Sequence, residues 1–294
     1  MRPNFLIIGT AKAGTTSLSL SLNEHPDVFV SGPDEVHFFS FDELYSRGPE
    51  WYETLFAEAR GCRAVGEKSN SYTVRRHYPE APRRIAEYDP STKLIYMVRH
   101  PLKRIESLWV EMRSWRGPRS IPHLELVFLN KNEVIHHSFD RAVRENREFL
   151  VDSANYWSEL GVYRELFPDD QILVLFLEDF RKDPDRELKR CFEFLDVDPI
   201  SVEDPSSTHA NRSKDKRVPT RTLSMVRSLP WYGAWSELIP GRVKRLGYRF
   251  LKAPARKPDW QDSTRAFVVD RLREDTERFL QSCGRPTDFW DLGA

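Results

Sequence analysis

The sequence predicts an α/β fold in which one central parallel sheet is flanked by helices. Three apolar runs support this prediction, because each is short enough for a strand and leads into a stretch with helical spacing: 4–9, 93–98 and 171–176. Strands that alternate with helices along a chain usually form a parallel sheet, since the crossover helices cover its faces. A chain of 294 residues can form one large domain, and we expect a single domain over 1–294.

The elements follow one another in the order strand, loop, helix. The first run ends at Gly9 and leads into helical spacing over 14–24, the second leads into a helix that begins at Pro101, and the third is followed by a helix over 184–195. Further helices are expected over 79–88, 138–150, 155–167 and 262–280. The composition of 201–221 indicates a loop, and the segments 118–137 and 230–258 have no clear pattern.

The composition limits the kinds of partner. Lysine plus arginine number 45 and aspartate plus glutamate number 45, so no net charge would attract the chain to nucleic acid or to an anionic membrane. No apolar stretch at the start is long enough for a membrane span, and no signal-peptide cleavage pattern follows it. We therefore expect no nucleic-acid partner and no membrane insertion, and any anion site should be local. No feature of the sequence predicts an oligomeric state.

The cysteines indicate the compartment. Cys62, Cys191 and Cys283 are odd in number, far apart and without metal-ligand spacing. This pattern is typical of free thiols in a reducing compartment rather than of a disulfide framework. The sequence therefore predicts a cytoplasmic protein.

A loop that could hold a phosphate lies between the first strand and the first helix. It covers 9–17, at a place where free backbone N–H groups and the helix dipole favour an anion. Its glycine spacing matches a P-loop, but Thr15 follows Gly14 where an ATP or GTP loop has lysine, and the lysine stands inside the loop as Lys12. This arrangement suits a nucleotide with a single 5′-phosphate that carries a transferable group. The alternative is a tight turn with a surface lysine.

A second anion site is indicated after the second strand. Arg99 stands at the carboxyl end of that strand, and Ser107 comes eight residues later on the following helix. The guanidinium and the hydroxyl could converge on one phosphate, although a surface arginine and an ordinary helix serine would give the same pattern. Two anion sites on adjacent strand–helix units are what a 3′,5′-bisphosphorylated nucleoside requires.

Several motifs in one order resemble the sulfotransferases that use 3′-phosphoadenosine 5′-phosphosulfate (PAPS), and especially the branch that includes the heparan sulfate sulfotransferases. The loop over 10–17 resembles the family's 5′-phosphosulfate loop, and Arg99 with Ser107 resembles its 3′-phosphate motif. Other matching segments are 35–39, 51–52, 67–72, 172–180, 183–184 and 194–195. The resemblance implies a P-loop-like sulfotransferase fold, PAPS as sulfuryl donor and 3′,5′-ADP as product. Metal is optional in such chemistry, and no metal site is indicated.

The resemblance also implies roles for individual residues. The donor site would comprise Lys12, Ala13, Gly14, Thr15, Thr16, Ser17, Arg99, Ser107, Lys214, Lys216 and Arg217. Lys12 would neutralise the 5′-phosphate as 3′,5′-ADP departs, and Lys68 would stabilise the sulfuryl oxygens in the transition state. Glu35 matches the family's glutamate base, and His37 is the alternative base or a half-buried structural imidazole. Glu67 is expected to pair with a lysine or arginine and to hold the site together.

The loop over 213–219 resembles the late PAPS-binding loop of the heparan enzymes with two departures. Asp215 stands where those enzymes have glycine, and Lys216 stands where they have arginine. The cysteine-bridged hairpin that precedes this loop in the heparan enzymes is also absent. The acceptor is therefore left open among a carbohydrate, a lipid, a polyketide and a smaller metabolite, with a hydroxyl favoured over an amine.

Two other functions compete with this prediction. A P-loop nucleotide kinase or related NTPase would use the same first strand–helix unit, but no lysine follows Gly14 and no apolar strand ends in an aspartate placed to hold magnesium. A noncatalytic nucleotide-binding module is disfavoured because Lys12, Lys68 and Glu35 are all present. The sequence therefore predicts a PAPS-dependent sulfotransferase.

Overall fold

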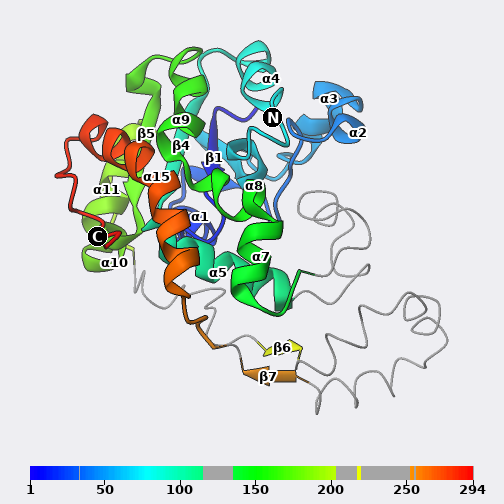
Figure 1. Ribbon diagram of the computed structural model, residues 1–294. Coiled ribbons are helices and arrows are strands. Elements are labelled where there is room, and N and C mark those ends of the chain that lie inside the picture. The colour runs from blue at the N-terminus through cyan, green and yellow to red at the C-terminus, as the bar shows by residue number, and fades with distance from the viewer. Residues whose placement is uncertain (33, 115–134, 203–216, 220–251, 255, 294) are drawn as a thin grey trace. The chain divides into compact units, whose positions relative to one another are not determined.

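The computed structural model describes residues 1–294 except 33, 115–134, 203–216, 220–251, 255 and 294 (Figure 1). The chain divides into two compact units, of which the first comprises 1–104, 153–210 and 272–294 and the second comprises 105–152 and 211–271. A single domain over 1–294 stays a prediction.

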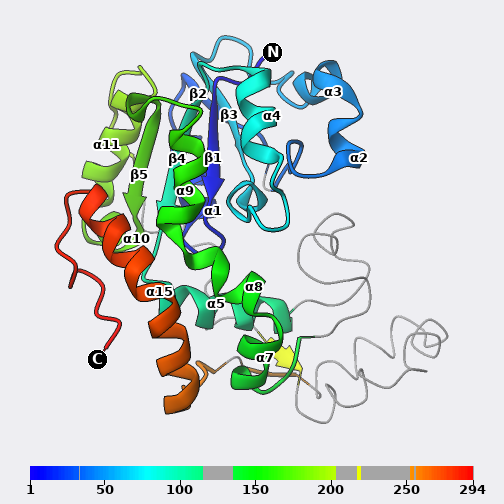
Figure 2. The same ribbon diagram turned by 45° about the horizontal axis from the view of Figure 1, so that its top comes forward.

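The first unit is built on a five-stranded sheet with the order β2-β3-β1-β4-β5 (Figure 2). Neighbouring strands pair in parallel throughout this sheet, which confirms the predicted fold class. The strands are β1 (Phe5–Gly9), β2 (Val28–Val30), β3 (Ala64–Lys68), β4 (Lys93–Val98) and β5 (Ile172–Phe176). The three predicted runs are β1, β4 and β5. The sequence does not predict β2, which has three residues, or β3, in which Glu67 and Lys68 interrupt the apolar pattern.

The helices predicted within the described residues are present. They are α1 (Thr15–Leu22), α4 (Ala81–Tyr88), α5 (Pro101–Ser114), α7 (Phe139–Glu145), α8 (Arg147–Leu150), α9 (Tyr156–Arg164), α11 (Pro184–Phe194) and α15 (Asp262–Ser282). The sequence does not predict the shorter helices, which are α2 (Asp42–Tyr45), α3 (Gly48–Thr54), η1 (Asn70–Thr73), η2 (Asp152–Ala154), η3 (Asp169–Gln171) and α10 (Leu177–Lys182). The helix predicted over 138–150 is divided into α7 and α8, because Asn146 leaves the helical region of backbone conformation with φ −112° and ψ 36°.

Helices of the first unit cover both faces of the sheet. On one face, Ile7 of β1 lies in a core cluster with Leu18 of α1 and Phe192 of α11. On the other face, Tyr96 of β4 meets Tyr156 of α9, with ring centroids 6.2 Å apart. Strands that are buried on both faces must be apolar along their whole length, which explains why β1 and β4 are so clear in the sequence.

The parallel arrangement also determines where the polar loops lie. The carboxyl ends of β1, β3 and β4 meet at one edge of the sheet, because these three strands are neighbours and run in the same direction. The segments that follow them begin at Thr10, Ser69 and Arg99. Ligand sites of open parallel sheets form at this edge.

The second unit contains the small antiparallel pair of β6 (Arg217–Pro219) and β7 (Lys252–Pro254). Aromatic and polar contacts connect its helices to the segment before α15. The indole nitrogen of Trp260 donates to Glu106 at 2.9 Å, and the rings of Trp260 and Phe139 meet at right angles with centroids 4.7 Å apart. The segments 118–137 and 230–258 lie largely outside the described residues.

Candidate active site

The loop between β1 and α1 turns through two residues in the left-handed region. Lys12 has φ 70° and Gly14 has φ 97°. A Cβ at Gly14 would lie 2.8 Å from Cδ1 of Leu177, so glycine satisfies both the backbone and the packing there. Lys12 takes a conformation that is uncommon for a residue with a Cβ and that often marks a functional position. Because α1 begins at Thr15, the N–H groups of its first turn, which have no carbonyl partner within the helix, lie at the end of this loop, where such groups favour an anion.

Two arginines hold the carbonyl groups of this loop. Arg99 Nη1 donates to the Lys12 carbonyl at 3.2 Å, and Arg104 Nε donates to the Ala11 carbonyl at 3.1 Å. The Arg104 side chain is only 1% exposed and also donates to Ser153 Oγ at 3.1 Å. Arg104 is not among the residues predicted from the sequence. Its position five residues after Arg99, on the helix that follows the same strand, could have indicated a second arginine near the loop. Arg99, which follows β4, and Arg104 of α5 therefore both contact the backbone of the phosphate loop.

For four predicted donor contacts, the described residues do not show whether they meet at the loop. Ser107 is buried on α5 but belongs to the second unit, so its convergence with Arg99 stays a prediction. Lys214 and Lys216 lie outside the described residues. Arg217 begins β6, and only its backbone is described.

Lys68 and Lys12 both act on the carboxylate of Glu35. Lys68 ends β3, is only 3% exposed and aligns with Ile7 of the neighbouring strand β1. Burial raises the pKa of Glu35 above its ordinary value, whereas hydrogen bonds from Asn70 and the charges of Lys68 and Lys12 lower it. Three of the predicted catalytic residues therefore share one electrostatic environment beside the phosphate loop.

The carboxylate of Glu35 is held by hydrogen bonds and lies beside His37. The backbone N–H of Asn70 donates to Glu35 Oε2 at 2.9 Å, and the Asn70 side-chain amide donates to Oε1. His37 Nε2 lies 3.4 Å from Glu35 Oε2. The two predicted bases are thus neighbours, and which of them accepts the proton stays a prediction.

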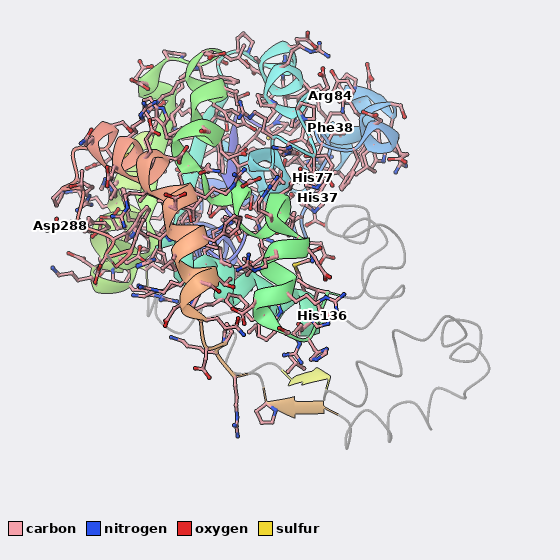
Figure 3. All side chains as sticks on the ribbon, viewed as in Figure 1. His37, Phe38, His77, Arg84, His136 and Asp288 are labelled. Atoms are coloured by element: carbon pink, nitrogen blue, oxygen red, sulfur yellow. The ribbon has the colours of Figure 1, made fainter. Side chains whose placement is uncertain are left out.

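The side chain of His37, labelled in Figure 3, is buried and is also held on its other side. His37 Nδ1 lies 2.7 Å from Ser71 Oγ, and the His37 backbone N–H donates to Ser69 Oγ at 2.7 Å. These contacts hold a residue whose backbone is left-handed, with φ 57°. Sequence reasoning missed Ser69 and Ser71 as supports, since serines of a short segment carry no pattern of their own.

Glu67 lies next to Lys68 on β3 but points into a cluster of hydroxyl groups. It accepts from Tyr72 at 2.6 Å, from Ser69 at 2.8 Å and from Tyr52 at 3.3 Å. The expected ion pair with a lysine or arginine is therefore wrong, because the carboxyl group is fully buried among neutral donors. Burial is the main cause that raises the pKa of Glu67 to about 7, and these hydrogen bonds oppose it.

The raised pKa of Glu67 predicts a dependence of stability on pH. The folded state binds the proton more tightly than the unfolded state, so the free energy of unfolding should fall as pH rises from about 4.5 to about 7. The decrease in the free energy of unfolding that Glu67 causes over this pH range is on the order of 3 kcal/mol. Denaturant unfolding of the wild type and of Glu67→Gln across this range measures it. Parallel pH profiles for the two proteins would contradict the prediction, because the other buried carboxyl groups contribute equally to both.

The described part of the chain contains no cluster of three or more histidine, cysteine or acidic side chains that could hold a metal ion. None of its helices is long and apolar enough to cross a membrane. Cys62, Cys191 and Cys283 are free, as predicted.

A parallel sheet with a phosphate loop after its central strand, and with two lysines and a glutamate beside the loop, defines an α/β protein of the phosphate-loop class. Residues 2–229 match the sulfotransferase domain family. This match covers well over half of the sequence, and the chain belongs to the sulfotransferase family. The kinase alternative is set aside on this ground.

Curated relatives agree with the motif resemblance. The chain is 28% identical to the bifunctional heparan sulfate N-deacetylase/N-sulfotransferase 4 of Mus musculus, over 98% of this chain and 31% of that protein. It is 34% identical to the heparan sulfate glucosamine 3-O-sulfotransferase 3B1 of Mus musculus, over 66% of this chain and 46% of that protein. The chain thus spans less than half the length of these relatives. The predicted similarity to the heparan sulfate branch is confirmed.

A solved structure supports the fold over nearly the whole chain. The sulfotransferase from Alicyclobacillus acidocaldarius superposes with a TM-score of 0.63, at 23% sequence identity and 99% coverage of both chains. At that identity the likeness concerns the fold alone, which is the predicted sulfotransferase fold.

Proposed function

We propose that the chain transfers the sulfuryl group of PAPS to a hydroxyl or amine of a carbohydrate and releases 3′,5′-ADP. The observation that carries this proposal is the place of Lys68, which ends β3 beside the strand that leads into the loop of Lys12, while Asn70, two residues further on, holds the Glu35 carboxylate. The names of the relatives, which act on heparan sulfate, favour a sugar over a lipid or polyketide as the acceptor. Membership of the sulfotransferase family supports the reaction class.

The residues present suit a donor with one 5′-phosphate. The loop offers the N–H groups of the first turn of α1, and the left-handed backbone of Gly14 leads directly into that turn. Lys12 adds one positive charge inside the loop, and Arg99 adds another at the end of β4. Ser107, Lys214, Lys216 and Arg217 remain proposed contacts of the same donor.

The proposed reaction divides the work among three side chains. Glu35 accepts the proton of the acceptor group while the acceptor oxygen or nitrogen forms its bond to sulfur. The bond between sulfur and the bridging oxygen of the 5′-phosphate breaks, and Lys12 neutralises the charge that develops on that phosphate. Lys68 stabilises the sulfuryl oxygens in between. His37 keeps the Glu35 carboxylate in place or replaces it as the base.

Calorimetric titration tests the donor site before any acceptor is known. The protein should bind 3′,5′-ADP more tightly than 5′-AMP, and more tightly than ATP with magnesium. If it prefers ATP, the proposed function is wrong. After selective binding of 3′,5′-ADP, PAPS can be offered with heparan-type oligosaccharides, with and without their N-sulfate groups, and with a simple phenol as the control acceptor.

Arg99→Ala should weaken the binding of 3′,5′-ADP. Loss of a hydrogen bond between charged groups costs about 1.5–3 kcal/mol, which corresponds to roughly a 10- to 150-fold weaker Kd. The affinity for 5′-AMP should change less, because that nucleotide lacks the 3′-phosphate. Arg181→Ala, which removes an exposed arginine of α10, is the control. An unchanged Kd for 3′,5′-ADP would assign the 3′-phosphate to other residues.

The cytoplasm is the proposed location. The free state of the three cysteines supports a reducing compartment. Fractionation of cells that express the full-length protein would test it.

A further inference from the structure

Asn70 connects two parts of the candidate site that are far apart in the sequence. It begins the short helix η1 just after β3, and its side chain is 8% exposed. Its amide NH2 and its backbone N–H both donate to the carboxylate of Glu35. Its amide oxygen accepts from the hydroxyl of Thr15, the first residue of α1, at 3.3 Å.

Only one orientation of the Asn70 amide suits both neighbours. In this orientation the NH2 group faces the Glu35 carboxylate, which can only accept, and the carbonyl oxygen faces the Thr15 hydroxyl, which can donate. Rotating the amide by half a turn would place its oxygen against the carboxylate. An aspartate would place a second negative charge there, and an alanine would leave both neighbours without this link.

We propose that Asn70 is a positioning residue that fixes the Glu35 carboxylate relative to the phosphate loop, so that donor and base are aligned for transfer. This inference rests on the proposed function, in which Glu35 is the base and the loop holds the donor. Thr15 is part of the loop and Glu35 is not, so the two hydrogen bonds of the Asn70 side chain join the carboxylate to the loop. A 1 Å displacement of a reacting group can cost about 100-fold in rate, which is why such a link matters.

The charged groups around Glu35 determine how the link can be measured. Among the described residues, Lys12 of the loop and Lys68 of β3 favour the carboxylate, Glu67 of β3 lies close enough to disfavour it, and His37 contacts it. Burial raises the pKa of Glu35, and the side-chain hydrogen bond from Asn70 lowers it. Removal of that bond should therefore raise the pKa of Glu35 even when no nucleotide is bound.

The decisive variants are Asn70→Ala and Asn70→Asp. The pKa of Glu35 would be measured by NMR of protein with ¹³C-labelled glutamate carboxyl groups, with Glu35→Gln to assign its signal. The pKa should rise in Asn70→Ala and rise further in Asn70→Asp. Asn23→Ala is the matched control, because Asn23 also makes two side-chain hydrogen bonds, both to Val30 and remote from the loop. A Glu35 pKa in Asn70→Ala equal to that of the wild type would overturn the inference.

A second pair of measurements separates positioning from a general structural role. With PAPS and an acceptor found by screening, Asn70→Ala should lower kcat about 10-fold or more, move the acidic limb of the pH profile of kcat/KM to higher pH and leave KM for PAPS nearly unchanged. A loss of kcat without movement of the acidic limb would overturn the inference. If Asn70→Ala does not fold, Thr15→Val breaks the same link at the loop and leaves the hydrogen bonds to Glu35 in place. In Thr15→Val kcat should therefore fall without movement of the acidic limb, and an unchanged kcat would overturn the inference.

The two proposals can fail separately. Failure of the wild type to bind 3′,5′-ADP would overturn the proposed function. The NMR measurement would still decide whether Asn70 controls Glu35, because it needs no nucleotide. Wild-type binding and turnover together with an unshifted Glu35 would overturn the role of Asn70 alone.

Discussion

Replacement of Lys12 by alanine should reduce the turnover of PAPS by about 10²–10³-fold or more, the range found when one preorganised group that stabilises developing charge is removed. Lys12 is the one lysine within the loop, and its backbone is already left-handed there. Its ammonium group would neutralise the 5′-phosphate when the bond to sulfur breaks, so kcat should fall more than the affinity for 3′,5′-ADP. A steady-state assay of 3′,5′-ADP release measures this.

Two controls make the Lys12 result specific. Lys103→Ala removes an exposed lysine of α5 and should leave turnover unchanged. Lys12→Arg retains the charge with a different shape and should recover part of the rate. A near-normal rate for Lys12→Ala would remove this lysine from the mechanism.

Replacement of Glu35 by glutamine should slow transfer by about 100-fold or more while 3′,5′-ADP still binds. The glutamine retains the shape of the side chain but cannot accept the acceptor's proton. In the wild type, activity should fall as pH decreases through the pKa of Glu35, which burial raises above 4.5, because the base must be ionised. Rates across pH for the wild type and Glu35→Gln measure both effects.

If His37 is the base instead of Glu35, the two substitutions should give a different result. His37 lies beside Glu35 and is held by Ser71, so His37→Ala would disturb the position of the carboxylate as well as remove an imidazole. If transfer survives in Glu35→Gln and disappears in His37→Ala, the histidine is the base. Loss in both variants, with the acidic limb retained in His37→Ala, would assign His37 to positioning.

The sequence predicts those strands and helices that carry a regular hydrophobic pattern over a few consecutive residues. The strands β1, β4 and β5 are apolar throughout because both faces of the sheet are covered, and the helices show their period over several turns. β3 is hidden because its last two residues, Glu67 and Lys68, are charged and yet buried. Their burial depends on hydroxyl groups and on a neighbouring strand that no local pattern reveals.

The sequence predicts which residues belong to the candidate site, but it does not predict most of the contacts between them. Lys12, Lys68, Glu35 and His37 could be named from the resemblance, and the structure brings them together. The link from Glu35 through Asn70 to the loop could not be predicted, because it joins segments separated by 35 positions and depends on the orientation of one amide. Long-range hydrogen bonds of this kind require the fold to be known first.

The central place of β1 in the sheet has a consequence for how the protein folds. Phe5 aligns with Gly66 on one side and with Lys93 on the other, so β1 cannot complete its pairing until both of these later segments of the chain are in place. Such long-range parallel pairing slows folding and leaves an apolar segment exposed in the meantime. The phosphate loop also depends on the pairing of β1 with β4, because the N–H of Thr10 donates to the carbonyl of Met97 in β4 at 2.6 Å. The loop can therefore reach its final shape only after β4 has joined the sheet, and nucleotide binding would report that the sheet is assembled.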